Sequence, residues 1–239
     1  MKSSSFILIC FVAILSLSIF GCATTGVSGG GGSQPSGVNW VLAKNGGRAT
    51  AFNEEPEHPA STLIDGVTSS DGWDQGAGWQ ASITSTTGGR RSARTVRDEE
   101  ERNWVIIEFS QPVTVNQTRI YTVDSEKYPA AKFGVSDLLV QYELKTAAGD
   151  LIWANVNRPG KGIGDQNNTI RNNTSGVIDV RFEPVNTQKI RVLIYNTNDM
   201  IRSTDSSKSM EGFIRLTEIE TYGSGKMKER DKLDELFEK

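Results

Sequence analysis

A series of short apolar runs, bounded by turn residues, is the feature that most constrains the fold of this 239-residue chain. Within the runs apolar and polar residues alternate, which is the period of a half-buried strand. No segment between them keeps a helical period for long, and parallel strands would need helical crossovers. The pattern predicts an all-β, antiparallel β-sandwich. The runs span residues 104–109, 118–123, 137–142, 176–182, 189–195 and 214–222.

The runs lie in a body of residues 39–223, a length that buries a good core as one domain. The tail that follows, residues 224–239, is expected to form a short charged C-terminal helix, because its apolar side chains share one helical face. These side chains are Met227, Leu233, Leu236 and Phe237. A helix this short is marginal alone in water, so it should need a surface to fold on.

The N-terminus has the layout expected of an export signal. Lys2 supplies a positive charge, and residues 6–20 form an almost unbroken apolar run that ends at Gly21-Cys22. A membrane-spanning helix needs about 20 apolar residues, and this run is shorter and is followed by a glycine-serine stretch. Residues 1–21 are therefore expected to be a signal peptide that is removed.

The residues Ile19-Phe20-Gly21-Cys22 resemble the lipobox of bacterial lipoproteins, although Phe20 departs from the small or medium residue usual before the glycine. The resemblance implies that Cys22 is acylated, as with palmitate, and becomes the first residue of the mature chain. Stable anchoring takes more than one acyl chain, and lipoproteins of this class carry several. Because Cys10 lies inside the signal, no disulfide within the mature chain is possible.

Residues 22–38 are rich in glycine and serine and are expected to form a flexible tether. Ala23 follows the predicted lipidated cysteine. An aspartate at that place would resemble the inner-membrane retention signal of enteric bacteria, so the sequence favours the outer membrane. The expected location is the bacterial cell envelope, reached through a lipid anchor.

Composition excludes several function classes. The chain has 26 basic and 29 acidic residues and no nucleic-acid motif, so no nucleic-acid partner is expected. The one histidine, His58, lies in a segment that reads as an exposed turn. Catalysis needs a positioned nucleophile, base or metal, and no such group stands out. We therefore expect a protein that is not an enzyme.

The body resembles the coagulation factor 5/8 type C, or discoidin-like, domain. The resemblance implies a galactose-binding-like jelly roll, and bacterial relatives of this kind are commonly carbohydrate-binding modules without chemistry of their own. The matching segments, in order, are residues 39–51, Leu63-Ile64-Asp65-Gly66 with Gly72-Trp73, residues 104–113, residues 181–185, residues 190–194 and residues 215–223.

The same resemblance implies a structural cation site that suits calcium, which accepts several hard oxygen ligands. The side chains expected to bind are those of Asp65 and Glu218. In place of a threonine of the family, Ser70 or Asp71 would contribute. The alternative is that Asp65 only makes an Asx turn and that Glu218 faces solvent. The expected backbone carbonyl ligands are those of Thr62, Val67 and Thr217.

In sugar-binding relatives, loops at one end of the sandwich present an aromatic ring to the sugar and polar groups to its hydroxyls. Trp79, among glycines, and Tyr128 are the expected ring contacts, whereas Trp73 matches a buried tryptophan of the family. The long polar stretch at residues 84–102 contains Arg90 and Arg91, which could bind an anionic polysaccharide or be neutralised by the acidic residues that follow.

The sequence thus predicts a lipid-anchored, non-catalytic carbohydrate-binding protein of the cell envelope. An alternative is an envelope structural or adhesion protein that binds another protein through the sandwich and the C-terminal helix. Binding to a membrane surface, as in clotting-factor members of the family, would use exposed apolar loop tips, and the sequence does not identify such tips.

Overall fold

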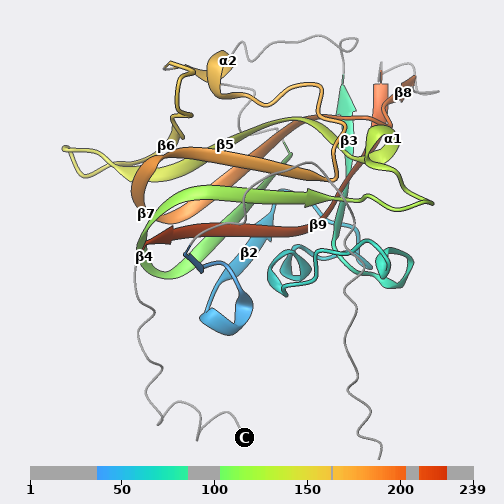
Figure 1. The fold of residues 1–239 in the computed structure, drawn as a ribbon, viewed down its shortest axis with the longest axis horizontal. Coiled ribbons are helices and arrows are strands. Elements are labelled where there is room, and N and C mark those ends of the chain that lie inside the picture. Colours follow the sequence, from blue (N-terminus) through green and yellow to red (C-terminus); the bar gives the residue numbers. More distant parts are fainter. Residues whose placement is uncertain (1–36, 86–102, 163, 203–209, 225–239) are drawn as a thin grey trace, which may run out of the picture. The chain divides into compact units, whose positions relative to one another are not determined.

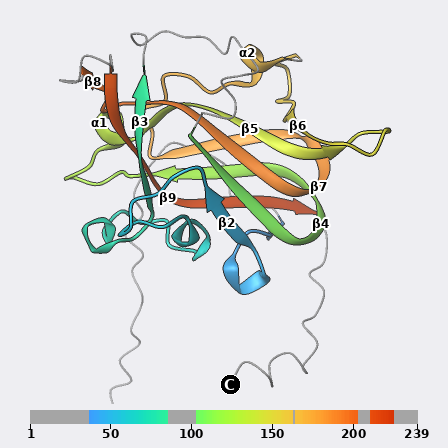
Figure 2. The same cartoon turned by 180° about the vertical axis from the view of Figure 1, so that it is seen from behind.

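A computed structural model describes residues 37–85, 103–162, 164–202 and 210–224. The pairings between its strands are all antiparallel, and helices are few and short (Figures 1 and 2). The all-β antiparallel prediction is therefore confirmed. The strands are β1 (Val38–Asn39), β2 (Arg48–Ala51), β3 (Trp79–Ser85), β4 (Asn103–Thr122), β5 (Val135–Lys145), β6 (Leu151–Asn155), β7 (Val177–Thr197), β8 (Ile201–Arg202) and β9 (Met210–Ser224).

Two long strands, β4 and β7, each take part in both layers of the sandwich. The first part of β4 and the last part of β7 pair with each other, and they also pair with β2 and β5, while β6 extends that layer beyond β5. The last part of β4 pairs with β9 and the first part of β7. The predicted runs 104–109 and 118–123 are thus two parts of one strand, as are 176–182 and 189–195.

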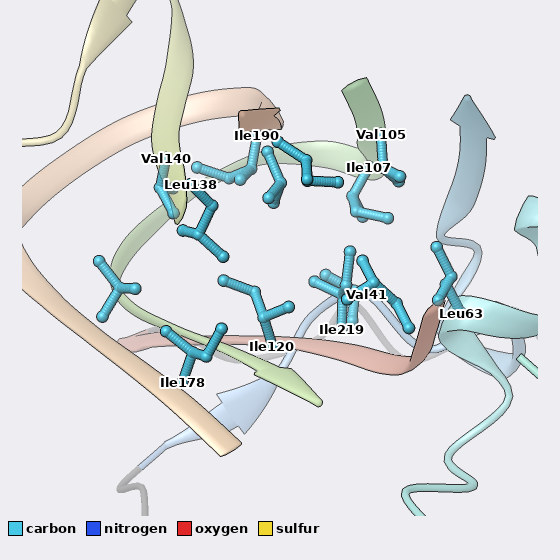
Figure 3. Close-up of a cluster of buried hydrophobic side chains, with 14 of the residues drawn as sticks. Val41, Leu63, Val105, Ile107, Ile120, Leu138, Val140, Ile178, Ile190 and Ile219 are labelled. Carbon is cyan, nitrogen blue, oxygen red and sulfur yellow. The ribbon is translucent and has the colours of Figure 1, made fainter. Parts of the chain in front are cut away.

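The core lies between these two layers. Figure 3 shows aliphatic side chains from both layers pointing toward one another, with Ile107 and Val140 on one side and Ile120 and Ile178 on the other. All four are almost fully buried. The alternation read from the sequence is the alternation that fills this core, because side chains of a strand point to its two faces in turn.

Register shifts decide which residues of the long strands face the core. In β4 a shift lies between Val115 and Gln117. Before this shift the buried side chains of β4 are at odd-numbered positions, such as Val105 and Val115. After it the even-numbered Ile120 is buried. A bulge of this kind adds one residue and so exchanges the two faces of the strand. A second shift lies in β9, beside Tyr121 and Thr122 of β4.

The remaining elements are short helices and turns. The α-helices are α1 (Ala130–Phe133) and α2 (Asp165–Asn168), and the 3₁₀ turns are η1 (Ala43–Asn45), η2 (Ala60–Ile64) and η3 (Trp73–Gln75). None of the helices in the described residues is long and apolar enough to cross a membrane. The tether residue Val38 pairs with Gly223, so the sheet begins one residue earlier than the sequence suggested.

Several sequence predictions fall outside the described residues. These are the signal peptide, the lipidated Cys22, most of the tether, Arg90 and Arg91, and the helix expected after Ser224. They stay predictions.

Candidate functional site

Glu218 is a buried carboxylate on β9. A register shift beside Tyr121 and Thr122 of β4 places an extra residue, Thr217, in β9. Before the shift Leu216 faces the core, and after it Ile219 does, while Thr217 and Glu218 between them are both buried. The expectation that Glu218 could face solvent is wrong, because the bulge turns its side chain inward.

The carboxyl group of Glu218 has only part of its hydrogen bonding satisfied. Its Oε2 accepts a hydrogen bond from the Gly66 N–H at 3.2 Å, whereas its Oε1 is buried without a hydrogen-bond partner in the described part of the chain. Burial raises the pKa of Glu218 to about 9, the Gly66 N–H opposes this, and the charge of Asp65 adds to it. A buried carboxylate with an unused oxygen is costly unless a cation or proton satisfies it.

Asp65 ends η2 and lies beside Glu218, on whose pKa it acts. Its Oδ1 also accepts the N–H of Val67 at 2.8 Å, so the Asx turn is present. The turn and the cation site are therefore compatible, because one carboxylate accepts several contacts.

The other expected metal residues lie in the same neighbourhood. The Thr217 hydroxyl donates to the carbonyl of Thr68 at 3.1 Å, which ties the loop after η2 to the bulge in β9. The Thr62 hydroxyl donates to the carbonyl of Pro59, and Val67 is exposed. Ser70 is turned to another partner, since its Oγ accepts the N–H of Asp124 at 2.8 Å.

These residues fit a hard cation such as calcium. Asp65 and Glu218 would supply carboxylate oxygens, and a cation there would satisfy the buried Oε1 that the described residues leave without a partner. No group of three or more His, Cys, Asp and Glu side chains is arranged to hold a metal among the residues that the structure describes. A site built from Asp65, Glu218 and backbone carbonyls contains two such side chains, not three.

Trp79 is not a loop residue. It begins β3, lies opposite Leu216 of β9, and is fully buried in the core. Its Nε1 donates to the carbonyl of Asn53 at 2.9 Å. The prediction that Trp79 contacts a ligand is wrong, because no face of its ring reaches the surface.

Trp73 is buried, as the resemblance implies. The ring of His58 stacks on it, with 4.4 Å between ring centroids, and Nδ1 of His58 lies 3.3 Å from the carbonyl oxygen of Gly78. The predicted turn is present, since the His58 N–H donates to the carbonyl of Glu55 and residues 56 and 57 between them are exposed, but the His58 ring itself is half-buried by this stacking.

Tyr128 is a half-buried loop residue between β4 and α1. Its hydroxyl donates to Asp74 at 2.8 Å, and its ring meets the ring of Phe133 edge to face, with 5.5 Å between centroids. Hydrogen bonds from Lys127 and Tyr128 hold the pKa of Asp74 below its usual value. Tyr128 does not itself line the pocket described next, and its contact with a ligand stays a prediction.

A pocket of about 610 Å³ is lined by residues of β3, β8, β9 and α1. Figures 1 and 2 show β3, β8 and α1 together at one end of the sandwich. Ser82 of β3 is directly opposite Phe213 of β9, and Thr84 is opposite Glu211. Opposed residues of antiparallel strands share a face, so all four side chains lie on the same side of the sheet. The lining residues are 82–84, 132–133, 198–201, 211–213 and Arg215.

An ion pair lies in the pocket wall. Nη1 of Arg215 lies 2.5 Å from Oδ2 of Asp199, and each side chain is only 11% exposed. Asp199 also accepts hydrogen bonds from the Thr197 hydroxyl at 2.8 Å and the Phe213 N–H at 3.2 Å. The pair is therefore fixed by the protein itself.

Two phenylalanine rings flank the guanidinium of Arg215. Its Cζ lies 5.2 Å from the ring centroid of Phe213 and 5.4 Å from that of Phe133, within the range of cation–π attraction. Phe213 is 40% exposed although it is a large apolar side chain. The pocket thus combines an accessible ring with a fixed cation and a fixed carboxylate.

Gly212 allows the segment after β7 to approach β9 closely. A Cβ atom at this position would lie 2.8 Å from Oδ1 of Asp199 and 3.0 Å from Sδ of Met200. Any other residue would push Asp199 away from its partners, so the glycine is part of the architecture of the pocket.

Sequence reasoning missed the pocket. Phe213 and Arg215 lie on a strand, where alternating exposed residues are normally only solvated. Asp199 lies in the connection between β7 and β8, far from both in sequence. The one available signal was Phe133, an aromatic residue next to a glycine in a predicted loop.

Comparison with known proteins gives structural likeness only. No family model matches the chain, and no curated protein matches it. A family 32 carbohydrate-binding module from Streptococcus pneumoniae EndoD is 16% identical with a TM-score of 0.47, over 78% of this chain and 100% of that one.

Two further solved structures are similar at the same level. A family 32 module from C. perfringens NanJ, in complex with galactose, is 14% identical with a TM-score of 0.46, over 77% of this chain and 98% of that one. Chitosan-binding module 1 from a chitosanase/glucanase of Paenibacillus sp. IK-5 is 16% identical with a TM-score of 0.44, over 78% of this chain and 99% of that one. Such modules have the discoidin-like fold that the sequence resemblance implies. At these identities and TM-scores the likeness does not decide what this chain binds.

Proposed function

We propose that this protein binds carbohydrate without catalysing a reaction, and that it does so in the pocket between β3, β9 and α1. The observation that carries the proposal is the exposed ring of Phe213 next to the largely buried Arg215–Asp199 pair. The volume of about 610 Å³ lies within the range of ligand pockets, about 300–1,000 Å³.

The chemistry of the wall suits a sugar. A sugar ring has an apolar C–H face, which packs on an aromatic ring such as that of Phe213. Its hydroxyl groups both donate and accept hydrogen bonds. The guanidinium of Arg215 supplies N–H donors, and the carboxylate of Asp199 supplies acceptors. Such fixed polar groups orient a ligand, while the ring supplies contact area.

The test is glycan-array binding of the purified full-length protein, followed by titration of the best glycan. Phe213→Ala removes the exposed ring and should weaken binding by about tenfold or more, which corresponds to about 1.4 kcal/mol. Phe52→Ala is the matched control, because Phe52 is also exposed, at 46%, and does not line the pocket. It should bind like the wild type.

Equal binding by the Phe213→Ala and Phe52→Ala variants would move the site away from the pocket. A wild-type protein that unfolds cooperatively but binds no glycan would refute the function and favour an envelope protein that binds a protein partner.

We also propose that calcium stabilises the domain through Asp65 and Glu218. The buried Oε1 of Glu218 without a partner in the described residues supports this. Calcium bound there would tie η2 to β9 and would neutralise the two carboxylates. A calcium titration followed by calorimetry tests it, and absence of heat in the wild type would contradict it.

The proposed location is the bacterial envelope, most simply the outer membrane, with Cys22 carrying the lipid. The support is the apolar run that ends at Gly21-Cys22. Labelled palmitate should enter the wild-type protein and not a Cys22→Ser variant, and equal labelling of the two would contradict the anchor. Fractionation of the membranes then reports which membrane holds the protein.

A further inference from the structure

The ionisable side chains that line the pocket are balanced. Lys132 and Arg215 are basic, and Asp199 and Glu211 are acidic, so their formal charges cancel. They differ in position, since Lys132 is exposed while the side chains of Arg215 and Asp199 are each 11% exposed. Water screens an exposed charge far more than a buried one. The Arg215–Asp199 pair therefore dominates the electrostatics of the pocket wall.

Asp199 neutralises Arg215 through a direct contact at 2.5 Å. Hydrogen bonds between charged groups are among the strong ones in proteins, and more so where water is partly excluded. An anionic ligand that approaches the guanidinium would meet the carboxylate of Asp199 at the same place. It would have to displace Asp199 or sit beside a like charge.

Displacement is opposed by the other partners of Asp199. Its carboxylate also accepts hydrogen bonds from the Thr197 hydroxyl at 2.8 Å and from the Phe213 N–H at 3.2 Å. The lack of a Cβ at Gly212 leaves the space in which the carboxylate lies. The position of Asp199 against Gly212 and its hydrogen bonds are both made within the protein. Asp199 therefore neutralises Arg215 before any ligand binds.

We infer that Asp199 makes the pocket selective for uncharged glycans and against sugars that carry carboxylate or sulfate groups. The inference rests on the proposed function and adds the class of ligand. Asp199 acts as a positioning residue for Arg215, and its charge is also a repulsive element toward anions. Selectivity commonly comes from such a repulsive element together with an attractive one.

The test uses the full-length protein and the variant Asp199→Asn, which has nearly the same shape and lacks the charge. The pocket then carries a net positive charge around Arg215. Inorganic sulfate is the first probe, measured by calorimetry at constant ionic strength. The variant should bind sulfate at least about tenfold more tightly than the wild type, because the guanidinium of Arg215 then lacks its carboxylate partner and can donate charge-assisted hydrogen bonds to sulfate. On the glycan array it should shift toward sulfated and uronic-acid sugars.

Two further variants make the result specific. Glu143→Gln removes one carboxylate from another ion pair, with Lys189 at 3.2 Å, on β5 and outside the pocket. It should bind sulfate as the wild type does. The double variant Asp199→Asn with Arg215→Gln should lose the gained affinity, which places the sulfate at the guanidinium.

The outcomes separate this inference from the proposed function. A wild-type protein that binds no glycan refutes the proposed function, and the selectivity falls with it. If the wild type binds neutral glycans but Asp199→Asn, with an unchanged melting temperature, gains no affinity for sulfate, only the selectivity is refuted. A wild type that prefers acidic glycans, lost on Phe213→Ala, keeps the function and overturns the selectivity.

Discussion

Glu218 offers a quantitative prediction from a single buried group. In the folded protein its pKa is raised to about 9, from the ordinary value of 4.5. Between these two values the folded state holds a proton on this group that the unfolded state has released. The contribution of the group to stability is therefore fully present below pH 4.5 and is lost as the pH rises toward 9.

The size of the effect follows from linkage. Each pH unit inside this window changes the free energy of unfolding by about 1.4 kcal/mol. Without a bound cation, the step from pH 5 to pH 8 should lower the stability of the wild type by about 4 kcal/mol through this group. That figure is an upper value, because relaxation around a buried charge reduces the cost.

The assay is urea unfolding in chelator across pH 5 to pH 8, for the wild type and Glu218→Gln. Glutamine does not titrate, so the variant should lack this part of the pH dependence, and other groups cancel in the difference between the two proteins. Calcium should restore stability to the wild type at pH 8, because a cation then takes the place of the proton, and should do little for the variant.

Glu220→Gln is the matched control for this experiment. Glu220 lies two residues further along β9 and accepts a hydrogen bond from the Tyr121 hydroxyl at 2.6 Å. This variant should keep most of the pH dependence of the wild type, since Glu218 is intact and burial, rather than the charge of Glu220, is the main cause of its raised pKa. If the free energy of unfolding depends on pH in the same way for the wild type and Glu218→Gln, the reasoning about burial is refuted. If calcium does not stabilise the wild type, the cation site is refuted.

Three other substitutions follow from the packing. Trp79→Ala should cost about 3–5 kcal/mol of stability in urea unfolding, because the ring is fully buried, and a loss below 1 kcal/mol would contradict its place in the core. Gly212→Ala should weaken glycan binding by displacing Asp199, so unchanged affinity would count against the pocket. Thr122→Val leaves the N–H of Val135 without its acceptor and should lower the free energy of unfolding by about 1–3 kcal/mol. Unchanged hydrogen exchange of the Val135 amide would contradict this.

The strands that were predicted are those whose pattern is local. Residues 137–142 lie in β5 and residues 214–222 in β9. Short apolar runs bounded by turn residues mark such strands, even in β5, where Leu138, Leu139 and Val140 are all buried. The sequence did not predict that residues 104–109 and 118–123 form one strand, β4, because a proline between them, Pro112, usually argues against a continuous strand. The register shift between Glu108 and Val113 accommodates it, as bulges commonly do for proline.

Other elements were missed because their sequences are short or mixed. Among residues 79–84 of β3, the buried ones are Trp79, Ala81 and Ile83, and the glycines before Trp79 indicate a loop. The strand forms because β9 provides a partner along its whole length. β6, at the edge of the sheet next to β5, is similar, since Leu151 and Ile152 are exposed and do not mark a buried face.

The residues of the proposed cation site were likewise only partly predictable from the sequence. The resemblance pointed to Asp65 and Glu218, and the structure places them together. The sequence did not decide whether Glu218 faces solvent or the interior, because a glutamate on a strand is usually exposed. The bulge at Thr217 decides it, and the bulge depends on pairing with β4, about a hundred residues away in the chain.

The sequence by itself determined the fold class and the position of most of the core strands, because alternation and turn chemistry act between neighbours in the chain. Tertiary structure alone decided that Trp79 is core and that Phe213 and Arg215 face a pocket. The physical reason is that these roles depend on contacts between distant segments. Asp199 reaches Arg215 only where the end of β7 packs against Gly212 of β9.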